Sequence, residues 1–299
     1  MLSIEINNVS KVYKNGYQAL KQINLKVKKG QFLALLGKNG AGKTTFVEIL
    51  TSLTKKSSGT IIINGYDLDQ NNESIRLKIG MVPQELNMSI FEKVIQILVT
   101  QAGYFGINRN IALVRAEKYL KKLSLWDKRM QPLISLSGGM KKRLMIARAL
   151  MHNPDIIFFD EPTAGVDVEI RHKIWEIMKD LNDQGKTIIL TTHYFEEAET
   201  LCDSLAVISK GRIIIHDSLI KILNRYLEQK FLVQIAPNDN INLKDCTINQ
   251  ISDILLEIMI NSNNTLSQNI KKITSAGVTI QSIKPKNNRL EELFLSLEE

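Results

Sequence analysis

The amino-acid sequence predicts an α/β fold with a parallel sheet at its centre, an inserted helical subdomain and a small α+β appendage. Short apolar runs that fit buried strands alternate with segments of helical apolar spacing, as in sheets covered by crossover helices. From residue 86 to about 136 the spacing is helical throughout, and from residue 226 it weakens. We therefore expect a main domain over residues 1–225, with the helical subdomain at about 86–145, and an accessory domain over 226–299.

The N-terminal part of the chain predicts two kinds of strand. Residues 2–13 and 23–30 alternate in strand fashion, which favours antiparallel strands at the N-terminus. Residues 31–37 form a continuous apolar run that ends in Gly, which is typical of a strand buried on both faces. The elements expected next are a helix at 44–53 and strands at 58–68 and 78–85.

The helical insert covers two segments, residues 90–106 and 110–126. Sheet character returns after it in the order strand, helix, strand, which is the βαβ unit of a parallel sheet. These three elements are expected at residues 155–162, 169–185 and 186–193. Residues 203–218 then predict a hairpin that turns at Lys210 and Gly211.

The tail predicts fewer regular elements. Residues 238–250 and 261–269 are rich in Asn and resemble loops. Between them, residues 251–260 favour a helix. A strand at 277–285 and a terminal helix at 288–299 complete the expected α+β appendage.

The bulk properties are those of a soluble globular protein. The chain has 299 residues, of which 44% are hydrophobic and 23% charged. Cys202 and Cys246 lie far apart and in no metal or redox spacing, so we expect a reducing compartment and no disulfide framework. No signal peptide or membrane-spanning apolar run is recognisable, so we expect a soluble or peripheral chain.

The net charge of +8 raises the question of an anionic partner. The excess lies before residue 224, with 31 Lys and Arg against 22 Asp and Glu, whereas the remaining tail has 8 against 9. A basic surface suits nucleic acid or anionic lipid, but the sequence contains no RNA-binding aromatic pattern and no Cys/His finger. We therefore expect no nucleic-acid partner.

A phosphate-loop pattern, Gly-x-x-x-x-Gly-Lys-Thr, lies between a predicted buried strand and a predicted helix. Its glycines let the backbone curl so that N–H groups converge on phosphate oxygens. Lys43 would reach the β- and γ-phosphates of a nucleotide, and the Thr44 hydroxyl would bind Mg²⁺. The candidate phosphate-binding residues are Gly37, Lys38, Asn39, Gly40, Ala41, Gly42, Lys43, Thr44 and Thr45.

A second helix start suited to an anion follows in the segment "LSGGMKKRLMIARAL", residues 136–150. Ser137, Gly138 and Gly139 stand at its beginning, so the N-terminus of the expected helix carries no bulky side chain. The alternative is a glycine-rich helix cap without a ligand. The sequence therefore poses the question of why one chain holds two such starts.

Two carboxylates follow four apolar residues in "IIFFDE", residues 156–161. Ligands of α/β proteins bind at the carboxyl ends of parallel strands, where these acids are expected. Asp160 is a candidate for holding Mg²⁺ through water, and Glu161 for orienting or deprotonating an attacking water. A simple helix cap before Pro162 is the alternative interpretation of this pair.

Three single side chains are candidates because of where they stand. His193 follows the next predicted strand and could contact a γ-phosphate, and Gln84 follows another strand. Tyr13 precedes the first turn and could stack on a base. Each has an ordinary alternative, since a lone His, Gln or Tyr is usually a core or surface residue.

Taken in order, these motifs resemble the nucleotide-binding subunits of ABC transporters over about residues 2–222. Tyr13 stands at the position of the A-loop, residues 37–45 at Walker A and Gln84 at the Q-loop. The segment "LSGGM" matches the ABC signature. The second anion-binding helix start is thereby explained, because in this family the signature of one copy completes the Walker A site of the other.

The later motifs complete the resemblance. Asp160 and Glu161 close Walker B, "AGVD" ending at Asp167 is the D-loop, and His193 is the H-loop. The combined segments look most like the ATPases of ABC-2-type exporters. Two positions depart from the common family pattern: Met140 replaces a frequent Gln, and the D-loop is Ala-Gly-Val-Asp. Met140 lacks the polar contacts of Gln, which puts a role for that side chain in nucleotide contact in doubt.

The resemblance implies a P-loop NTPase with a RecA-like core that binds ATP and Mg²⁺ and hydrolyses ATP. The implied catalytic residues are Lys43, Glu161 and His193. The implied Mg²⁺ ligands are Thr44, Gln84 and Asp160. The nucleotide would also contact Tyr13, Gln84, Ser137, Gly138, Gly139 and Asp167.

The resemblance also implies partners. Two copies would form a homodimer with ATP between the Walker A site of one and the signature of the other. The dimer would drive a separately encoded, six-helix membrane permease from the cytoplasmic face of the cell membrane, with the helical subdomain as the docking part. Two alternatives stay open: a soluble ABC ATPase of translation or DNA repair, and a mechanical driver of a membrane protein.

Overall fold

The computed structural model describes residues 1–85, 88–225, 229–236, 248–260, 265–286 and 289–296. The chain divides into two compact units, Met1–Asp217 and Ser218–Glu299. The division falls eight residues before the boundary expected from the sequence, because helix α8 (Leu219–Arg225) is part of the second unit. No helix within these described ranges is long and apolar enough to span a membrane.

Among the described residues, the first unit is built on a six-stranded sheet of order β10-β9-β3-β8-β7-β6. Strands β3 (Phe32–Leu36), β7 (Ile156–Asp160) and β8 (Thr187–Thr192) run parallel, and every residue in them is buried. Full burial explains their continuous apolar sequence, because elements cover both faces of the sheet. β6 (Ile79–Val82) and β9 (Ser204–Ser209) pair in parallel at either side. The predicted α/β class is confirmed.

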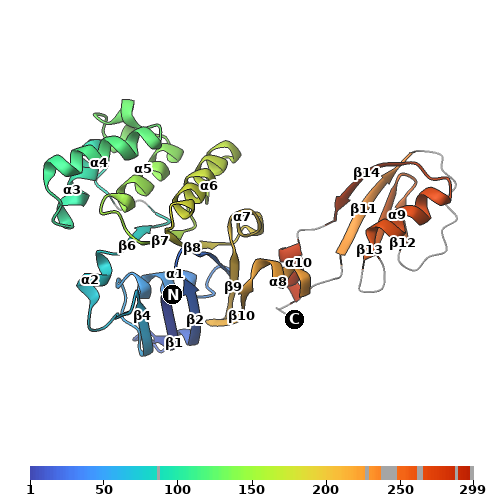
Figure 1. Cartoon of the computed structure of the whole chain (residues 1–299), viewed down its shortest axis with the longest axis horizontal. Helices are drawn as coiled ribbons and strands as arrows, with labels where there is room; N and C mark the ends of the chain where they lie inside the picture. The colour runs from blue at the N-terminus through green and yellow to red at the C-terminus, as the bar shows by residue number, and fades with distance from the viewer. Residues whose placement is uncertain (86–87, 226–228, 237–247, 261–264, 287–288, 297–299) are drawn as a thin grey trace. The chain divides into compact units, whose positions relative to one another are not determined.

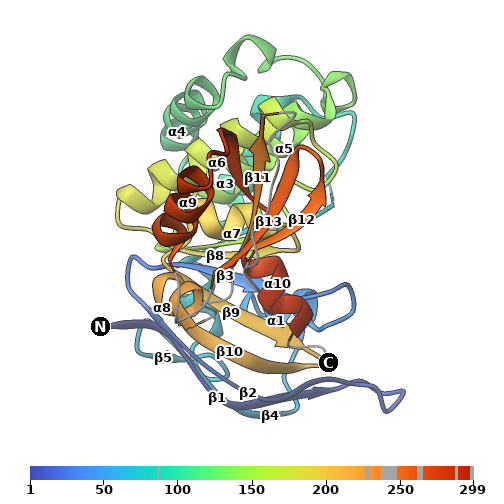
Figure 2. The ribbon, with the colours of Figure 1, turned by 90° about the vertical axis from the view of Figure 1, so that its right-hand side faces the viewer.

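An antiparallel sheet forms a second layer of this unit (Figure 2). Its order is β2-β1-β4-β5, with bounds Gln18–Lys28, Leu2–Val12, Ser58–Ile63 and Tyr66–Asp67. Buried and exposed residues alternate along β2, because its inner side packs on the main core. Helix α1 (Lys43–Leu50) lies against this layer and the parallel sheet and joins their apolar cores.

The helical subdomain has its own core, and its helices are grouped together in Figure 1. Helices α3 (Val94–Tyr104), α4 (Arg109–Lys122) and α5 (Gly138–Leu150) pack together around buried Leu and Ala side chains. The apolar spacing predicted a helix from residue 90, but helix α3 begins at Val94. The preceding backbone pairs instead with residues 129–134, for example where the Ile134 amide donates to the Ile90 carbonyl at 2.8 Å.

The turns between elements follow the sequence closely. The hairpin of β9 and β10 (Arg212–Ser218) turns at Lys210 and Gly211, with φ of 48° and 79°. Helix α6 (Val168–Asp183) is capped by the Asp167 carboxylate, which accepts from the Ile170 amide at 2.8 Å. Shorter helices α2 (Asn72–Arg76) and α7 (Phe195–Leu201) complete the unit.

The second unit contains an antiparallel sheet of order β12-β13-β11-β14. The helix predicted at 251–260 is wrong: β12 (Ile248–Ser252) and β13 (Leu255–Ile260) form paired strands there. β13 also pairs with β11 (Gln229–Ile235), and β11 pairs with β14 (Ile280–Pro285), which confirms the strand predicted at 277–285. The apolar pattern of residues 251–260 fits both a helix and a strand, and pairing with strands distant in sequence therefore determines their structure.

The helices of the second unit also differ in part from the prediction. Helix α9 (Leu266–Ser275) begins inside the segment 261–269 that was predicted as a loop. Its capping box, made by Thr265 and Gln268, was the sequence signal for this helix. The terminal helix is confirmed as α10 (Arg289–Ser296). Residues 238–247 of the other predicted loop, which include Cys246, lie outside the described residues.

Candidate functional site

The phosphate loop lies between β3 and α1, and two of its glycines are required by contacts with neighbouring strands. Gly42 stands before α1 with φ of 110°, and a Cβ there would lie 2.9 Å from the Ala19 carbonyl oxygen of β2. A Cβ on Gly37 would lie 2.6 Å from the carbonyl oxygen of Ile208 in β9. At these two glycines the loop therefore runs directly against both strands.

Lys43 is buried within this loop, with 5% of its surface exposed. Its ammonium donates to the carbonyl oxygens of Gly37 at 2.6 Å and Lys38 at 3.2 Å. It also lies 3.4 Å from the Glu161 carboxylate. The charge of each buried group is thereby compensated by the other, which offsets the cost of removing both from water.

A cleft of about 400 Å³ opens beside the loop. It brings the predicted phosphate-binding residues other than Gly37 and Ala41 together with Gln84 and Glu161, which follow β6 and β7. The lining residues are Tyr17, Ala19, Lys38, Asn39, Gly40, Gly42, Lys43, Thr44, Thr45, Gln84 and Glu161. The cleft thus has amide donors, a cation and a carboxylate, the groups that phosphate transfer requires.

Glu161 is the point at which the predicted catalytic side chains meet. Its carboxylate lies 3.4 Å from the Lys43 ammonium, 3.2 Å from the Gln84 amide nitrogen and 3.3 Å from His193 Nδ1. Its backbone has φ of 46° and donates its N–H to Thr191, at 3.1 Å from the carbonyl and 3.2 Å from the hydroxyl. A positive φ outside glycine is a strained conformation that occurs preferentially at functional sites.

Asp160, the neighbour of Glu161, is 4% exposed and accepts a hydrogen bond from the Thr191 hydroxyl. Burial raises the pKa of its carboxyl above the usual range, and the bond from Thr191 opposes this increase. A buried carboxylate whose charge is disfavoured gains by receiving a cation. Its carboxylate, the Thr44 hydroxyl and the Gln84 side-chain oxygen are the hard donors that Mg²⁺ prefers, so the chemistry of these residues fits the predicted ion. Thr44 and Gln84 line the cleft, whereas Asp160 does not.

The structure does not bring the signature or the D-loop into this cleft. The Ser137 hydroxyl accepts from the Met140 amide at 3.3 Å and so caps helix α5, while Asp167 caps α6. A Cβ on Gly139 would lie 2.1 Å from Ile170 Cδ1 of α6, whereas one on Gly138 would meet nothing within 4 Å. Of the two glycines, one therefore serves helix packing and the other leaves an open surface.

The predicted base-stacking residue also lies outside the lining. The Tyr13 hydroxyl is 3.1 Å from the Thr45 hydroxyl, and the Lys11 ammonium stands 4.8 Å from the centre of its ring. Tyr17, which the sequence analysis did not select, lines the cleft with 55% of its surface exposed. Its signal was the same as that of Tyr13, an aromatic residue close to the first turn.

The sequence analysis also made no prediction for Glu197, a buried carboxylate that does not line the cleft. Glu197 is fully buried in α7 and accepts from Trp175 Nε1 at 3.2 Å, from the Thr192 hydroxyl at 2.6 Å and from the Thr163 hydroxyl. These donors come from α6, the end of β8 and the segment after Walker B. Glu197 therefore links the segment that follows β7 to the end of β8 through hydrogen bonds with their side chains. The sequence signal is its place four residues after His193, on a short helix.

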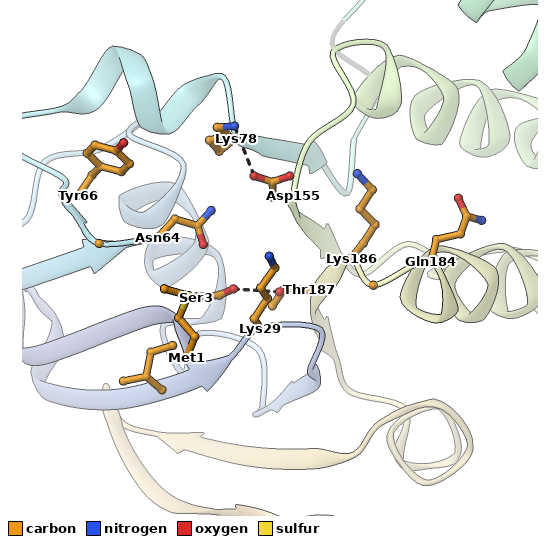
Figure 3. Close-up of a pocket in the computed structure, with 13 residues that line it drawn as sticks. Met1, Ser3, Lys29, Asn64, Tyr66, Lys78, Asp155, Gln184, Lys186 and Thr187 are labelled. Carbon is orange, nitrogen blue, oxygen red and sulfur yellow. Dashed lines mark hydrogen bonds and ion pairs between the residues drawn. The ribbon is translucent and has the colours of Figure 1, made fainter.

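A larger hollow of about 720 Å³ lies at the opposite, amino-terminal end of the strands (Figure 3). Lys29, Lys78 and Lys186 surround Asp155 there, and Lys78 pairs with that acid at 3.6 Å. Its lining includes neither the phosphate loop nor the two acids at the end of β7. The smaller cleft, which contains the phosphate loop, is therefore the candidate nucleotide site.

A buried parallel sheet, a phosphate loop and an acid pair at a strand end together define a P-loop nucleotide-binding protein. Comparison with known proteins narrows this class. The family described as ABC transporter matches residues 20–164. The ATP-binding protein I of Nod factor export from Cupriavidus metallidurans is 42% identical over 211 residues, which cover 71% of this chain and 69% of that protein.

A second relative covers nearly the whole chain. The linearmycin resistance ATP-binding protein LnrL of Bacillus subtilis is 31% identical over 98% of this chain and 97% of its own length. A solved dimeric cassette, MJ0796 in a post-hydrolysis state with ADP and Pi, has a TM-score of 0.67 and 30% identity and covers 72% of this chain and 98% of its own. The chain belongs to the ABC transporter family, as an ATP-binding subunit that hydrolyses ATP.

The first prediction concerns the signature glycines. We expect Gly139→Ala to lower the free energy of unfolding by about 1–3 kcal/mol, because its methyl group would overlap Ile170. The matched Gly138→Ala variant should be neutral or more stable by up to about 1 kcal/mol. Urea denaturation measures both. Adding Ile170→Val, which removes the overlapping Cδ1, should restore stability; equal effects at the two glycines would contradict the packing role.

The second prediction concerns Asp160. We expect Asp160→Asn to raise the thermal midpoint of the nucleotide-free chain by a few degrees, because burial disfavours the carboxylate. The gain should shrink as the pH falls towards the raised pKa, where the wild-type carboxyl also becomes neutral. Mg²⁺-dependent ATP hydrolysis should fall about a hundredfold.

Asp155→Asn is the control, because Asp155 precedes the same strand at its half-exposed amino end. It should change neither the midpoint nor the hydrolysis rate appreciably. Calorimetry over a pH series and a phosphate-release assay give the two readouts. A less stable Asp160→Asn variant would show that the carboxylate is satisfied without a cation.

Proposed function

We propose that this chain is the ATPase of an ABC-2-type exporter and that it drives a separate membrane permease from the cytoplasmic side. The convergence of Lys43, Gln84 and His193 on Glu161 carries the ATPase part of the proposal. The export part is supported by relatives named for Nod factor export and for linearmycin resistance. The second of these relatives also matches the tail, so the likeness extends beyond the cassette.

The working unit in this proposal is a homodimer. Ser137 and Gly138 are exposed at the start of α5 but do not line the cleft of their own chain. They would instead meet the phosphates of ATP bound by a second copy, where the helix start supplies amide donors. The solved relative MJ0796 is described as a dimer, which supports this arrangement. Two equivalent ATP sites would follow from the two-fold symmetry.

The hydrolysis step uses the contacts of Glu161. In the structure Lys43 pairs with Glu161, and γ-phosphate oxygens would compete for its ammonium. The released carboxylate would then orient a water and accept its proton as the oxygen attacks the γ-phosphorus. The bond from phosphorus to the β-phosphate oxygen breaks, which yields ADP and phosphate. Mg²⁺, when bound, would neutralise charge on the phosphates, and His193 would contact the γ-phosphate.

The dimer proposal predicts the behaviour of Glu161→Gln. The variant keeps the shape of the side chain but cannot accept a proton, so ATP should bind while turnover falls by about a hundredfold or more. We expect ATP to convert it to a stable dimer in size-exclusion chromatography. The same substitution at an exposed glutamate, Glu196→Gln, is the control, and this variant should hydrolyse ATP normally. A monomeric and fully active Glu161→Gln protein would rule out the proposed role.

A second experiment tests the proposed contact between the helical subdomain and the permease. Ile90 and Phe91 are 44% and 77% exposed at the edge of the helical subdomain, where they would meet a membrane partner. We expect the tagged chain, purified from gently solubilised native membranes, to carry a stoichiometric integral-membrane protein. Phe91→Asp should lose that protein and keep basal ATPase activity, whereas Val114→Asp, equally exposed on α4, should retain both.

The outcome of this purification also tests the alternative of a soluble ABC ATPase in translation or DNA repair. Ribosomes or DNA in place of a membrane protein would favour an ABC ATPase outside transport, for which the net charge of +8 is the supporting feature. A membrane protein that stays bound to the Phe91→Asp variant would place the contact on another surface.

A further inference from the structure

Lys142 connects the helical subdomain to the end of a sheet strand. It belongs to α5, whose first residues are the signature, and its ammonium donates to the backbone carbonyl of Gln84 at 2.6 Å. Gln84 follows β6 of the parallel sheet. The contact therefore joins two parts of the unit that have separate cores and are linked by the chain through residues 83–93.

Gln84 extends this connection to the catalytic carboxylate. Its side-chain amide donates to Glu161 at 3.2 Å, while its carbonyl accepts from Lys142. One residue is thus held on one side by the signature helix and on the other by Glu161. Burial lowers the pKa of Lys142, and the nearby carboxylates of Asp160, Glu161 and Glu85 oppose this decrease and favour the charged form.

The position of Lys142 on α5 means that a movement of this helix would change the contact with Gln84. The start of α5 would bind the phosphates held by the second copy, and Lys142 lies little more than one helical turn further along the same rigid helix. A shift of α5 on binding that nucleotide would move the Lys142 ammonium. Because the ammonium is bonded to Gln84, the shift would reach the amide that contacts Glu161 in the chain's own site.

We propose that Lys142 is a positioning residue that couples the two ATP sites of the dimer, by setting the place of Gln84 against Glu161 according to the position of α5. This inference rests on the proposed homodimeric ATPase. It gives the two sites a contact path within each chain: signature helix, Lys142, Gln84 and Glu161. Lys142 touches neither the nucleotide nor the attacking water in this scheme.

The experiment compares steady-state ATP hydrolysis by the full-length chain and its variants. We expect Lys142→Met to lower kcat about tenfold, because Gln84 is misplaced. KM should stay within about twofold, since the phosphate loop is untouched. We expect the Hill coefficient for ATP to be above 1 in the wild-type chain and close to 1 in Lys142→Met. Lys142→Arg, which keeps the charge and a donor, should restore most of kcat and the cooperativity.

The neighbouring Lys141→Met variant is the matched control, because it removes a cation from the same turn of α5 without a contact to Gln84. It should behave as the wild type does. Thermal denaturation accompanies each assay, and Lys142→Gln serves as a second neutral variant if Lys142→Met is unstable. A purely structural role would lower the thermal midpoint and would not change the Hill coefficient selectively.

Two outcomes would overturn the proposal. Lys142→Met or Lys142→Gln with wild-type kcat and cooperativity would show that Gln84 does not depend on the lysine. An equal loss in Lys141→Met would show that only the charge of this helix matters. Failure of the underlying function would give a different result, because the wild-type chain would then show no ATP turnover or its Glu161→Gln variant no ATP-dependent dimer.

Discussion

Two adjacent carboxylates, Asp160 and Glu161, stand at the end of a strand that is buried on both faces, and most of the site is arranged around their charge. Removing a carboxylate from water is costly unless cations or hydrogen-bond donors replace the lost solvent. The Thr191 hydroxyl donates to the Asp160 carboxylate and accepts from the Glu161 backbone N–H, and Lys43 lies within ion-pair distance of Glu161. Asp160 keeps a raised pKa despite this support, so its carboxylate is incompletely compensated in the structure. A bound cation would complete the compensation, and we therefore expect this carboxylate to lower the stability of the nucleotide-free chain and to favour metal binding.

The sequence predicted those parts of the site that depend on local patterns. A phosphate loop needs glycines at fixed spacing, and an acid that follows a buried apolar run must emerge at the end of a strand. The contacts between these parts were not predictable in the same way. That Gly139 serves helix packing while Gly138 stays open follows from Ile170, about thirty residues along the chain on another helix. Identical residue types in adjacent positions give no signal for such a difference.

The same limit explains the error in the second unit. Residues 251–260 are apolar at most positions, so both the helical and the strand period fit them. The choice is made by the ladder between β11 and β13, in which Phe231 lies opposite Ile258 and Val233 opposite Leu256. By contrast, α9 carried a local signal in its capping box, and local signals of this kind can be used before any pairing is known.

The helix that follows the phosphate loop, α1, and the helix that begins with the signature, α5, share a feature. Each places a lysine near the acid pair: Lys43 is the first residue of α1, and Lys142 stands near the start of α5. Both cations act on Asp160 and lower its pKa against the effect of burial. One helix belongs to the sheet core and the other to the helical subdomain, so the pKa of Asp160 depends on how these two parts are placed. In a buried site, a small change in the distance between a carboxylate and a cation alters their electrostatic energy more than it would in water. The energy of the partly compensated Asp160 carboxylate therefore depends strongly on the positions of Lys43 and Lys142.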